Sequence, residues 1–450
     1  MQKEAAFPEH KRTQALRSSM KEAGTAGTSA SISELYAVPF AKEIGTSPFY
    51  IGVLSALTGI AAPLAQLYGS ALLHRASRKR IVLLFSLLQA LLWLPLIALA
   101  LALHRGMLLT AGPLLFILFY TLLIAIGNVS FPAWFSWLGD IVKEQERGRY
   151  FSKRNRIIGF AGLLIVLAGA FVIDLAKTRG MLLLGFASIF AIAFTLRLFS
   201  LTFIKRMRAP SFTLHSRDQF SLFNFLRRMD SVGKFALYLA LLNAALMFAS
   251  PFFAVYMLQE LSFNYITLMA VMLSSTLFYL FFLPLAGRFS DRFGNIRLLH
   301  VANLFFILSP LCWILIQHPL LLIIVPQLVA GIANAALTIA ATNFLYDAVS
   351  PKHRPLCVTY TNILAGIGTF FGSLLGGAVL SVFHPSTLSP FLFLFAMAAL
   401  LRFLVGFIFL PHLKEARRVS PLPSFSLNLL HPFRSLNNDF TWVKRVLKEG

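Results

Sequence analysis

Long apolar runs separated by short charged loops fill the sequence from residue 24 to residue 410. A helix needs about 20 apolar residues to cross about 30 Å of hydrocarbon. Twelve runs reach that length: 24–43, 50–73, 80–103, 107–131, 157–177, 181–204, 235–258, 266–286, 296–316, 320–345, 360–382 and 389–410. They lack the alternation of a membrane barrel, and lipid cannot satisfy an open strand edge, so they predict twelve transmembrane helices.

The distribution of Lys and Arg favours twelve spans over eleven, although the first run is the weakest of the set. Its segment GTAGTSASISELYAVPF is rich in small polar residues and includes Glu34. With twelve spans both termini lie on one side, and the other side holds only Lys42, Arg105, Lys177 and Arg179. Because basic loops stay in the cytoplasm, we expect both termini to be cytoplasmic.

Composition supports a membrane protein, since 58% of the residues are hydrophobic and 13% are charged. The net charge of +23 raises the question of a nucleic-acid partner. We exclude nucleic acid, because the basic residues lie between long apolar runs and not on a soluble fold. About 20 polar residues precede the first run, so no cleavable signal peptide is recognisable. We expect an integral protein of the bacterial inner membrane, with lipids as partners.

Patterns for enzyme chemistry are missing from the sequence. It contains no GxxxxGK phosphate loop, no HExxH zinc pair and no GxSxG nucleophile turn. Cys312 lies in the ninth run and Cys357 in a loop, so the two do not predict a disulfide or a metal site. We therefore expect a protein that is not an enzyme and that uses no metal or other cofactor.

The two halves of the sequence repeat each other. Asp140, Arg147 and Asn155 recur 207 residues later as Asp347, Arg354 and Asn362. The glycines at positions 159 and 169 recur with the same offset at positions 366 and 376. The sequence therefore predicts a unit of six helices that occurs twice.

The loop GRFSDRFGNIR at 287–297 resembles the loop between the second and third helices of the major facilitator superfamily, and SALLHRASRKR at 70–80 is a weaker copy. The segment DIVKEQERGRYFSKRN resembles that family's connection between its fourth and fifth helices. The resemblance implies an all-α polytopic membrane protein of two six-helix bundles, related by a pseudo-twofold axis along the membrane normal. It also implies a central cavity with alternating access.

These boundaries divide the chain into five parts. We expect a cytoplasmic N-terminal segment at 1–23, a six-helix bundle at 24–204, a cytoplasmic linker at 205–234, a second bundle at 235–412 and a cytoplasmic tail at 413–450. In the linker, Phe220, Phe223 and Leu226 share one helical face beside two arginines, which is typical of an amphipathic helix on the membrane surface. The alternative is a disordered basic loop.

The resemblance also implies a gate of charged residues on the cytoplasmic side. In the family's pattern a loop Asp faces a helix N-terminus of the opposite bundle, and an Arg four residues later pairs with the Asp that ends the fourth helix. The first half keeps Arg78 and Asp140 but has His74 in place of the loop Asp, whereas the second half keeps Asp291 but has Asn295 in place of the Arg.

We therefore expect Asp291 to lie near the start of the fifth helix, among Lys153, Arg154 and Arg156, and to hold the inner gate shut. Arg292 or Arg297 is expected to reach Asp347 in place of the missing Arg. The candidate gating residues are Arg78, Asp140, Arg147, Asp291, Arg292, Arg297, Asp347 and Arg354. The alternative is that these charges only fix the topology.

Glu34 is the candidate coupling residue. Counted from Gly45 at 1.5 Å per residue, it lies about 16 Å from the outer end of its helix, close to the middle of the membrane. A carboxylate is costly in hydrocarbon, so a buried one is expected to take up and release a proton or to meet a cationic substrate. The alternative is that Glu34 only pairs with an arginine.

In the family's architecture the first, fourth, seventh and tenth helices line the cavity. The candidate substrate-binding residues on them are Tyr36, Asn128, Trp134, Trp137, Asn243, Gln327, Asn334, Thr338 and Asn343. Neutral amides and indoles suit a neutral or amphipathic organic solute better than a dianion, which needs paired arginines. The alternative is that several of these side chains only bond neighbouring helices.

The sequence thus predicts a monomeric secondary transporter that moves a small organic solute by alternating access and is linked to protons. A first alternative is a lipid or lysolipid flippase on the same fold, to which the 45 phenylalanines lend support. A second is a membrane receptor or assembly factor that does not transport, which the degraded loop in the first half favours.

Overall fold

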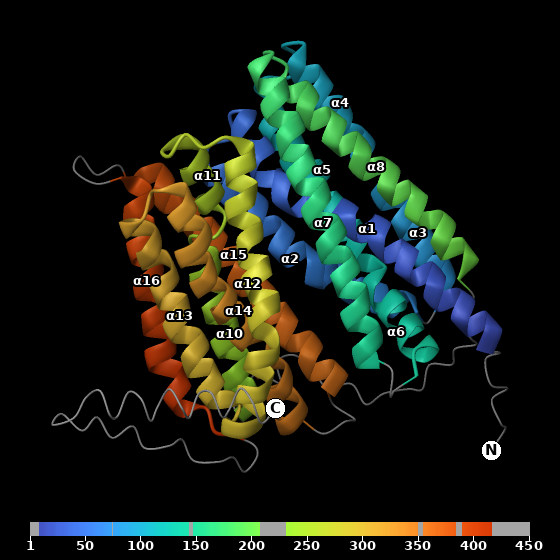
Figure 1. Cartoon of the computed structure of the whole chain (residues 1–450), viewed down its shortest axis with the longest axis vertical. Helices are drawn as coiled ribbons and strands as arrows, with labels where there is room; N and C mark the ends of the chain where they lie inside the picture. The colour runs from blue at the N-terminus through green and yellow to red at the C-terminus, as the bar shows by residue number, and fades with distance from the viewer. Residues whose placement is uncertain are drawn as a thin grey trace.

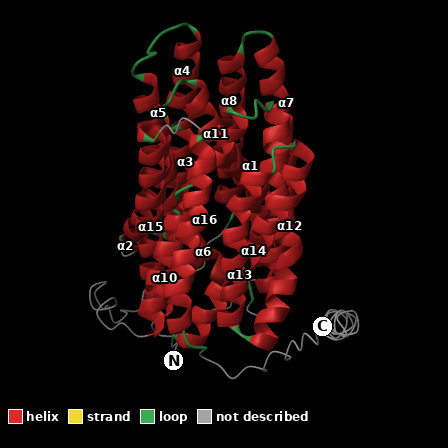
Figure 2. Ribbon diagram, turned by 90° about the vertical axis from the view of Figure 1, so that its left-hand side faces the viewer, coloured by secondary structure: helices red, strands yellow, loops and turns green. Residues whose placement is uncertain are grey.

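The computed structural model describes residues 9–73, 75–143, 147–207, 231–349, 354–383 and 389–415, and these residues form helices joined by short turns, without a strand (Figure 2). The first half contains α1 (Glu9–Glu43), α2 (Pro48–Leu72), α3 (Arg78–Leu91), α4 (Trp93–His104), α5 (Gly112–Val129), α6 (Phe131–Ile141), α7 (Arg147–Thr178) and α8 (Leu182–Arg206). The second half contains α10 (Ser231–Met247), α11 (Phe252–Gln259), α12 (Tyr265–Phe293), α13 (Asn295–Leu315), α14 (Pro319–Ala348), α15 (Arg354–Val382), α16 (Pro390–Phe409) and the 3-10 turn η2 (Leu410–His412).

Eleven helical stretches in the described part of the chain are long and apolar enough to cross a membrane. Three of them are interrupted: α3 continues as α4, α5 as α6, and α10 as α11. A proline lies at or near the start of each second helix, at positions 95, 132 and 251. Proline lacks a backbone N–H and clashes with the preceding turn, which explains these interruptions.

The twelfth predicted span is α1, which is less apolar than the others. Ser29 donates a hydrogen bond to the carbonyl oxygen of Ala193 on α8 (2.9 Å), and Tyr36 donates one to that of Val166 on α7 (2.5 Å). Because α7 and α8 are membrane spans, α1 crosses with them. The helix that contains this span is longer than the predicted apolar run, since α1 begins at Glu9 and residues 9–23 are also helical.

The helices form two bundles, α1–α8 and α10–α16 (Figure 1). We call these the N-bundle and the C-bundle. The start of α1 and the end of α16 lie at the same end of the molecule, which we call the terminal face. The opposite end is the distal face. The expected amphipathic helix at 220–228 lies outside the described residues, as does the tail from residue 416 onward.

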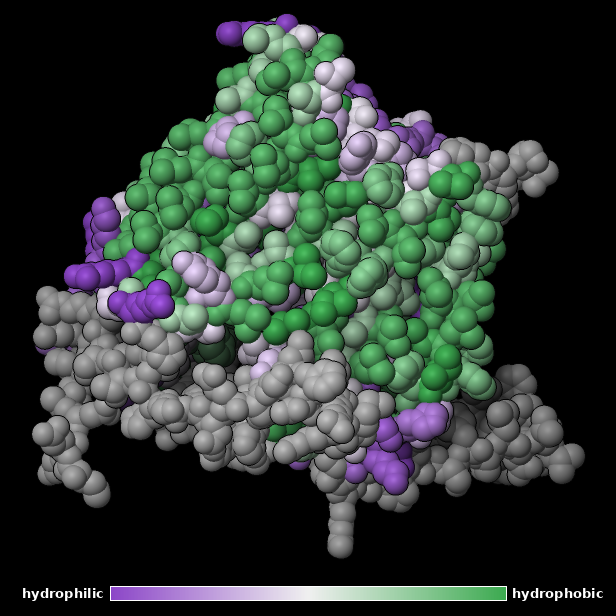
Figure 3. All heavy atoms as spheres, turned by 180° about the vertical axis from the view of Figure 1, so that it is seen from behind, coloured by the Kyte–Doolittle hydropathy of each residue, from purple (hydrophilic) through white to green (hydrophobic). Residues whose placement is uncertain are grey.

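Hydrophobic side chains cover most of the face seen in Figure 3, and hydrophilic residues gather at its upper and lower margins. Many large apolar side chains are exposed to the surroundings, for example Phe281 (68%) and Phe407 (69%). A band of this kind is stable only against lipid. The chain is therefore an integral membrane protein, as its sequence predicts.

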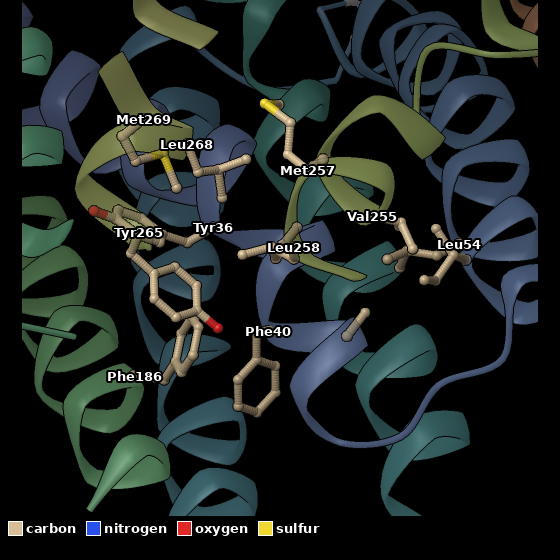
Figure 4. Packing of buried hydrophobic residues seen from close by; sticks show 14 of the residues in the cluster. Tyr36, Phe40, Leu54, Phe186, Val255, Met257, Leu258, Tyr265, Leu268 and Met269 are labelled. Carbon is tan, nitrogen blue, oxygen red and sulfur yellow. The ribbon is translucent and has the colours of Figure 1, made fainter. Parts of the chain in front are cut away.

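Buried apolar residues form three cores, of which one spans both bundles and each of the other two lies within a single bundle. The largest core joins the bundles: Tyr36, Phe40 and Leu54 of the N-bundle belong to the same cluster as Val255 and Leu268 of the C-bundle (Figure 4). The other two cores lie nearer the terminal face, and the described residues of each come from a single bundle. The bundles are therefore packed together in their distal halves.

Close contacts between α2 and α15 form a large part of the interface between the two bundles. A Cβ atom at Gly52 would lie 2.5 Å from the carbonyl oxygen of Ser373, and one at Gly366 would lie 2.7 Å from Pro63. Glycine allows the two backbones to approach this closely. The glycine of α15 at position 372 faces the other way, toward the carbonyl oxygen of Ala244 on α10, and packs α15 within its own bundle.

Candidate gate and cavity between the two bundles

On the terminal face, the N-bundle contains the ion pair that the sequence predicts. Arg78, at the start of α3, places Nη1 2.6 Å from a carboxylate oxygen of Asp140 on α6 and 3.1 Å from the hydroxyl of Ser136. The side chain of Arg78 is 1% exposed and that of Asp140 is 47% exposed. A buried guanidinium needs such a partner, so the pair fixes α3 to α6 within one bundle.

The corresponding site of the C-bundle uses amides. Asn295 donates a hydrogen bond to the carboxylate of Asp347 (2.7 Å) and accepts one from the hydroxyl of Ser290 (2.5 Å), which in turn accepts one from Asn343 (3.0 Å). Asn295 thus occupies the place of the missing Arg and bonds to Asp347 itself. An amide can donate and accept at once, so this neutral network satisfies the buried hydroxyl and the carboxylate together.

The expectation that Arg292 or Arg297 reaches Asp347 stays a prediction beside this amide contact. The guanidinium of Arg292 lies 5.5 Å from the ring centre of Phe293, and Arg297 donates to the carbonyl oxygen of Phe293 at 3.4 Å. Arg147 and Arg354 begin α7 and α15, and their side chains lie outside the described part of the structure.

The expected contact between Asp291 and the start of α7 stays a prediction. Asp291 is exposed near the end of α12, and the terminal ends of α7 and α12 diverge (Figure 1). Arg154 of α7 bonds within the N-bundle, with a carboxylate oxygen of Glu22 at 2.6 Å and the ring centre of Trp134 at 4.3 Å. Toward the terminal face, the described residues of the two bundles share no hydrophobic core.

A carboxylate joins the two bundles at the distal face instead. Asp174, near the end of α7, accepts hydrogen bonds from the backbone N–H groups of Tyr265 and Ile266, both at 2.9 Å. These are the first residues of α12, and the side chain of Asn264 accepts the next N–H, that of Thr267, at 2.8 Å. An anion is stabilised at a helix N-terminus by the free N–H groups and by the helix dipole.

Asp174 is not among the residues that the sequence predicts for the gate or for coupling. The chain offered one signal, which is an Asp inside the fifth apolar run in the sequence VIDLAK. Its partner could not be read from the sequence, since backbone N–H groups leave no residue signature. The geometry expected of Asp291 at one face is therefore realised by Asp174 at the other.

Glu34 lies on the side of α1 that faces away from the N-bundle core. Ser33, Tyr36 and Phe40 are buried in that core, whereas Glu34 is exposed. At 100° per residue, Glu34 is about 160° around the helix from Tyr36. Helix α1 also contacts α11 of the C-bundle.

The candidate substrate residues divide into two groups. Asn334 and Thr338 are exposed on one side of α14, while their neighbours Ala333, Ala336 and Ala340 are buried in the C-bundle. Polar side chains are costly against lipid, so this side of α14 suits a hydrated cavity.

Other candidates are less exposed and bond within a bundle, as Asn334 also does to the carbonyl oxygen of Ala330 (2.8 Å). Asn128 accepts a hydrogen bond from Gln66 (2.9 Å), and Asn243 donates to the carbonyl oxygen of Leu239 (2.8 Å). Tyr36 and Trp137 are fully buried and Gln327 is 8% exposed, so their expected place on the cavity wall is corrected. Each of these residues lies on the predicted helix, but the rotation of that helix about its axis differs from the expected one.

Two helical bundles that share a core at one membrane face and separate at the other form the framework of a membrane transporter. The sequence matches the model of the Major Facilitator Superfamily over residues 24–273 and again over 235–446, so the chain belongs to this superfamily. No curated protein matches the sequence.

Solved structures with a similar fold are also transporters. The nucleoside transporter NupG has a TM-score of 0.66 at 15% identity, with 90% of this chain and 99% of that chain covered. A bacterial homologue of the iron transporter ferroportin, in an inward-facing state, has a TM-score of 0.64 at 14% identity (91% and 100% covered). A bacterial homologue of the human lysosomal transporter Spinster, inward-facing and unoccupied, has a TM-score of 0.60 at 16% identity (92% and 100% covered). At these identities the likeness concerns the fold.

Proposed function

We propose that this protein is a proton-linked secondary transporter that moves a small organic solute by alternating access. The observation that carries the proposal is the distribution of the cores: one core spans both bundles in the distal half, and two separate cores lie toward the terminal face. Rigid bundles joined in this way can rock about their shared seam and expose a site between them to either face. Each chain contains both bundles, so a monomer suffices.

The terminal face is the cytoplasmic face in this proposal, because the basic loops lie there. The core that the two bundles share then lies toward the opposite, outer side of the membrane. Closure of the terminal face would bring Asp291 toward α7 and would break the bonds of Asp174 at the distal face. The two carboxylates thus belong to opposite states of one cycle.

The solute is expected to bind between Asn334 and Thr338 of α14 and the exposed side of α1. Neutral polar groups line this space on α14, and Glu34 supplies a single carboxylate on α1. Protonation and release at Glu34 would couple a proton to the movement of the solute. Nucleosides and short peptides are suitable first probes, since NupG carries nucleosides and another similar structure belongs to a peptide transporter.

Uptake into proteoliposomes, with and without a pH gradient, tests this function. We expect gradient-dependent uptake of one probe class by the wild type, and uptake that no longer responds to pH in Glu34→Gln. Glu260→Gln is the matched control, because Glu260 is an exposed distal carboxylate that bonds to Ser389 within the C-bundle. Unchanged pH dependence in Glu34→Gln would remove Glu34 from coupling.

The same vesicles distinguish the other functions. Movement of a labelled lipid without solute flux favours the flippase, and the absence of both favours a receptor. For the gate, equal transport by Asp291→Ala and the wild type at equal expression would refute the assigned role of Asp291.

A further inference from the structure

The first turns of α1 and the end of α8 enclose a basic hollow at the terminal face. Its volume is about 470 Å³, and it is lined by His10, Thr13, Gln14, Arg17, Ser18, Lys21, Phe203 and Arg206. All of these residues belong to the N-bundle. The hollow opens at the surface of the N-bundle, and neither the gate nor the proposed solute site uses it.

Three permanent cations in this hollow have no acidic partner among the described residues. Arg17, Lys21 and Arg206 are exposed, and none of them forms an ion pair there. The two acids on the same part of α1 are engaged elsewhere. Glu9 pairs with Arg12 (2.7 Å) and lies 3.5 Å from Lys143, and Glu22 pairs with Arg154 at 2.6 Å. The hollow therefore presents a concentrated positive charge to an incoming anion.

The position of the hollow relates this charge to the membrane boundary. Arg206 ends the membrane span Leu182–Arg206. One turn deeper, Phe203 forms part of the wall, with the ammonium group of Lys21 6.0 Å from its ring centre. Phe199, another turn deeper on α8, is 52% exposed. A ligand bound here meets cations at the membrane surface and an apolar helix face below them.

We propose that this hollow binds the phosphate head group of an anionic phospholipid. The guanidinium groups of Arg17 and Arg206 can donate paired hydrogen bonds to phosphate oxygens, and Lys21 adds a point charge. Gln14 is exposed on the same wall and supplies amide donors. The apolar face of α8 continues into the hydrocarbon, where acyl chains lie. That continuity favours a lipid over free phosphate.

Thermal unfolding of the purified full chain in detergent tests the site. Phosphatidylglycerol is titrated against phosphatidylcholine and inorganic phosphate, because a ligand that binds the folded state raises the unfolding temperature. The pocket variant combines Arg17→Gln, Lys21→Gln and Arg206→Gln. The matched control combines Arg75→Gln, Arg80→Gln and Arg288→Gln, which removes the same charge from exposed positions outside the hollow.

We expect saturable stabilisation of the wild type and of the control by phosphatidylglycerol, and none by phosphatidylcholine. The pocket variant lacks the three cations that would hold the phosphate, so it should bind phosphatidylglycerol on the order of 100-fold more weakly than the wild type. Equal binding by the pocket variant and the wild type would overturn the proposal. An equal loss in the control would overturn it too, since general surface charge would then account for binding. Equal protection by inorganic phosphate would refute the lipid assignment.

Discussion

Asp174 should hold the distal face closed, and its removal provides the sharpest test of how this protein is gated. Asp174→Ala deletes both hydrogen bonds to the first N–H groups of α12. A hydrogen bond to a charged group contributes about 1.5–3 kcal/mol, and these bonds are partly solvated, so we take the lower value for each. The loss of about 3 kcal/mol changes the ratio of distal-closed to distal-open molecules by roughly 100-fold.

Pulsed electron paramagnetic resonance between spin labels across the distal face measures this ratio. Arg179→Cys at the end of α7 and Gln259→Cys at the end of α11 place one label on each bundle at exposed positions. The native cysteines are first removed as Cys312→Ser and Cys357→Ser. We expect one short distance in the parent and an additional longer distance in Asp174→Ala. Asp174→Asn keeps one acceptor oxygen and should give an intermediate population.

Asn264→Ala is the matched control for fraying of α12. Asn264 caps the same helix end, but it belongs to the same bundle as the N–H group that it accepts. Its removal should lower stability by about 1 kcal/mol and leave the distance between the labels unchanged. Asp174 does not hold the distal face closed if Asp174→Ala retains the label distance of the parent, or if Asn264→Ala lengthens that distance to the same extent.

Three further predictions concern contacts within and between the bundles. Asp140→Ala should destabilise the protein by about 3 kcal/mol and Arg78→Leu by less, because Asp140→Ala leaves the guanidinium of Arg78 buried without its carboxylate. Chemical unfolding in detergent measures both losses, and a larger loss in Arg78→Leu would contradict the prediction. Arg402→Gln should cost at least about 2 kcal/mol more than Arg197→Gln, because the first donates to three backbone carbonyl groups and the second to one hydroxyl; equal melting temperatures would refute it. Gly52→Ala should lengthen the distal label distance, because its Cβ atom would lie 2.5 Å from a backbone oxygen of α15.

The fold was largely predictable, because apolar length and the repeat depend only on the order of residues along the chain. The sequence predicts most spans to within a few residues. The helices extend further at four ends: α1 starts at Glu9, the fourth span ends at Ile141 and not at 131, α7 starts at Arg147 and not at 157, and α12 ends at Phe293 and not at 286. The early residues of α1 are polar, and helices there are held by side-chain contacts such as Arg154 to Glu22. Such contacts depend on which helix packs against α1, and the hydropathy pattern does not show which helices are neighbours.

The candidate site was predictable in part. Arg78 and Asp140 could be paired because the repeat and the loop motif mark both positions. Tyr36 and Trp137 were assigned to a cavity because they lie on the right helices, but the side on which a residue lies depends on how the helix packs. The role of Asn295 was not predicted, because an amide in place of an arginine removes the positive charge that an ion pair needs. The amide nevertheless donates a hydrogen bond to the carboxylate of Asp347.

Whether the partners of a contact share a bundle determines what the contact does during rocking. Arg78 with Asp140, and Asn295 with Asp347, each join helices of one bundle, so they keep their geometry while the bundles move. The bonds of Asp174 cross between the bundles, so they must break before the distal face opens. The first two contacts should therefore control the stability of the folded protein, and Asp174 the balance between its two states. A mutation at Asp174 that changed stability and left that balance unchanged would reverse this assignment.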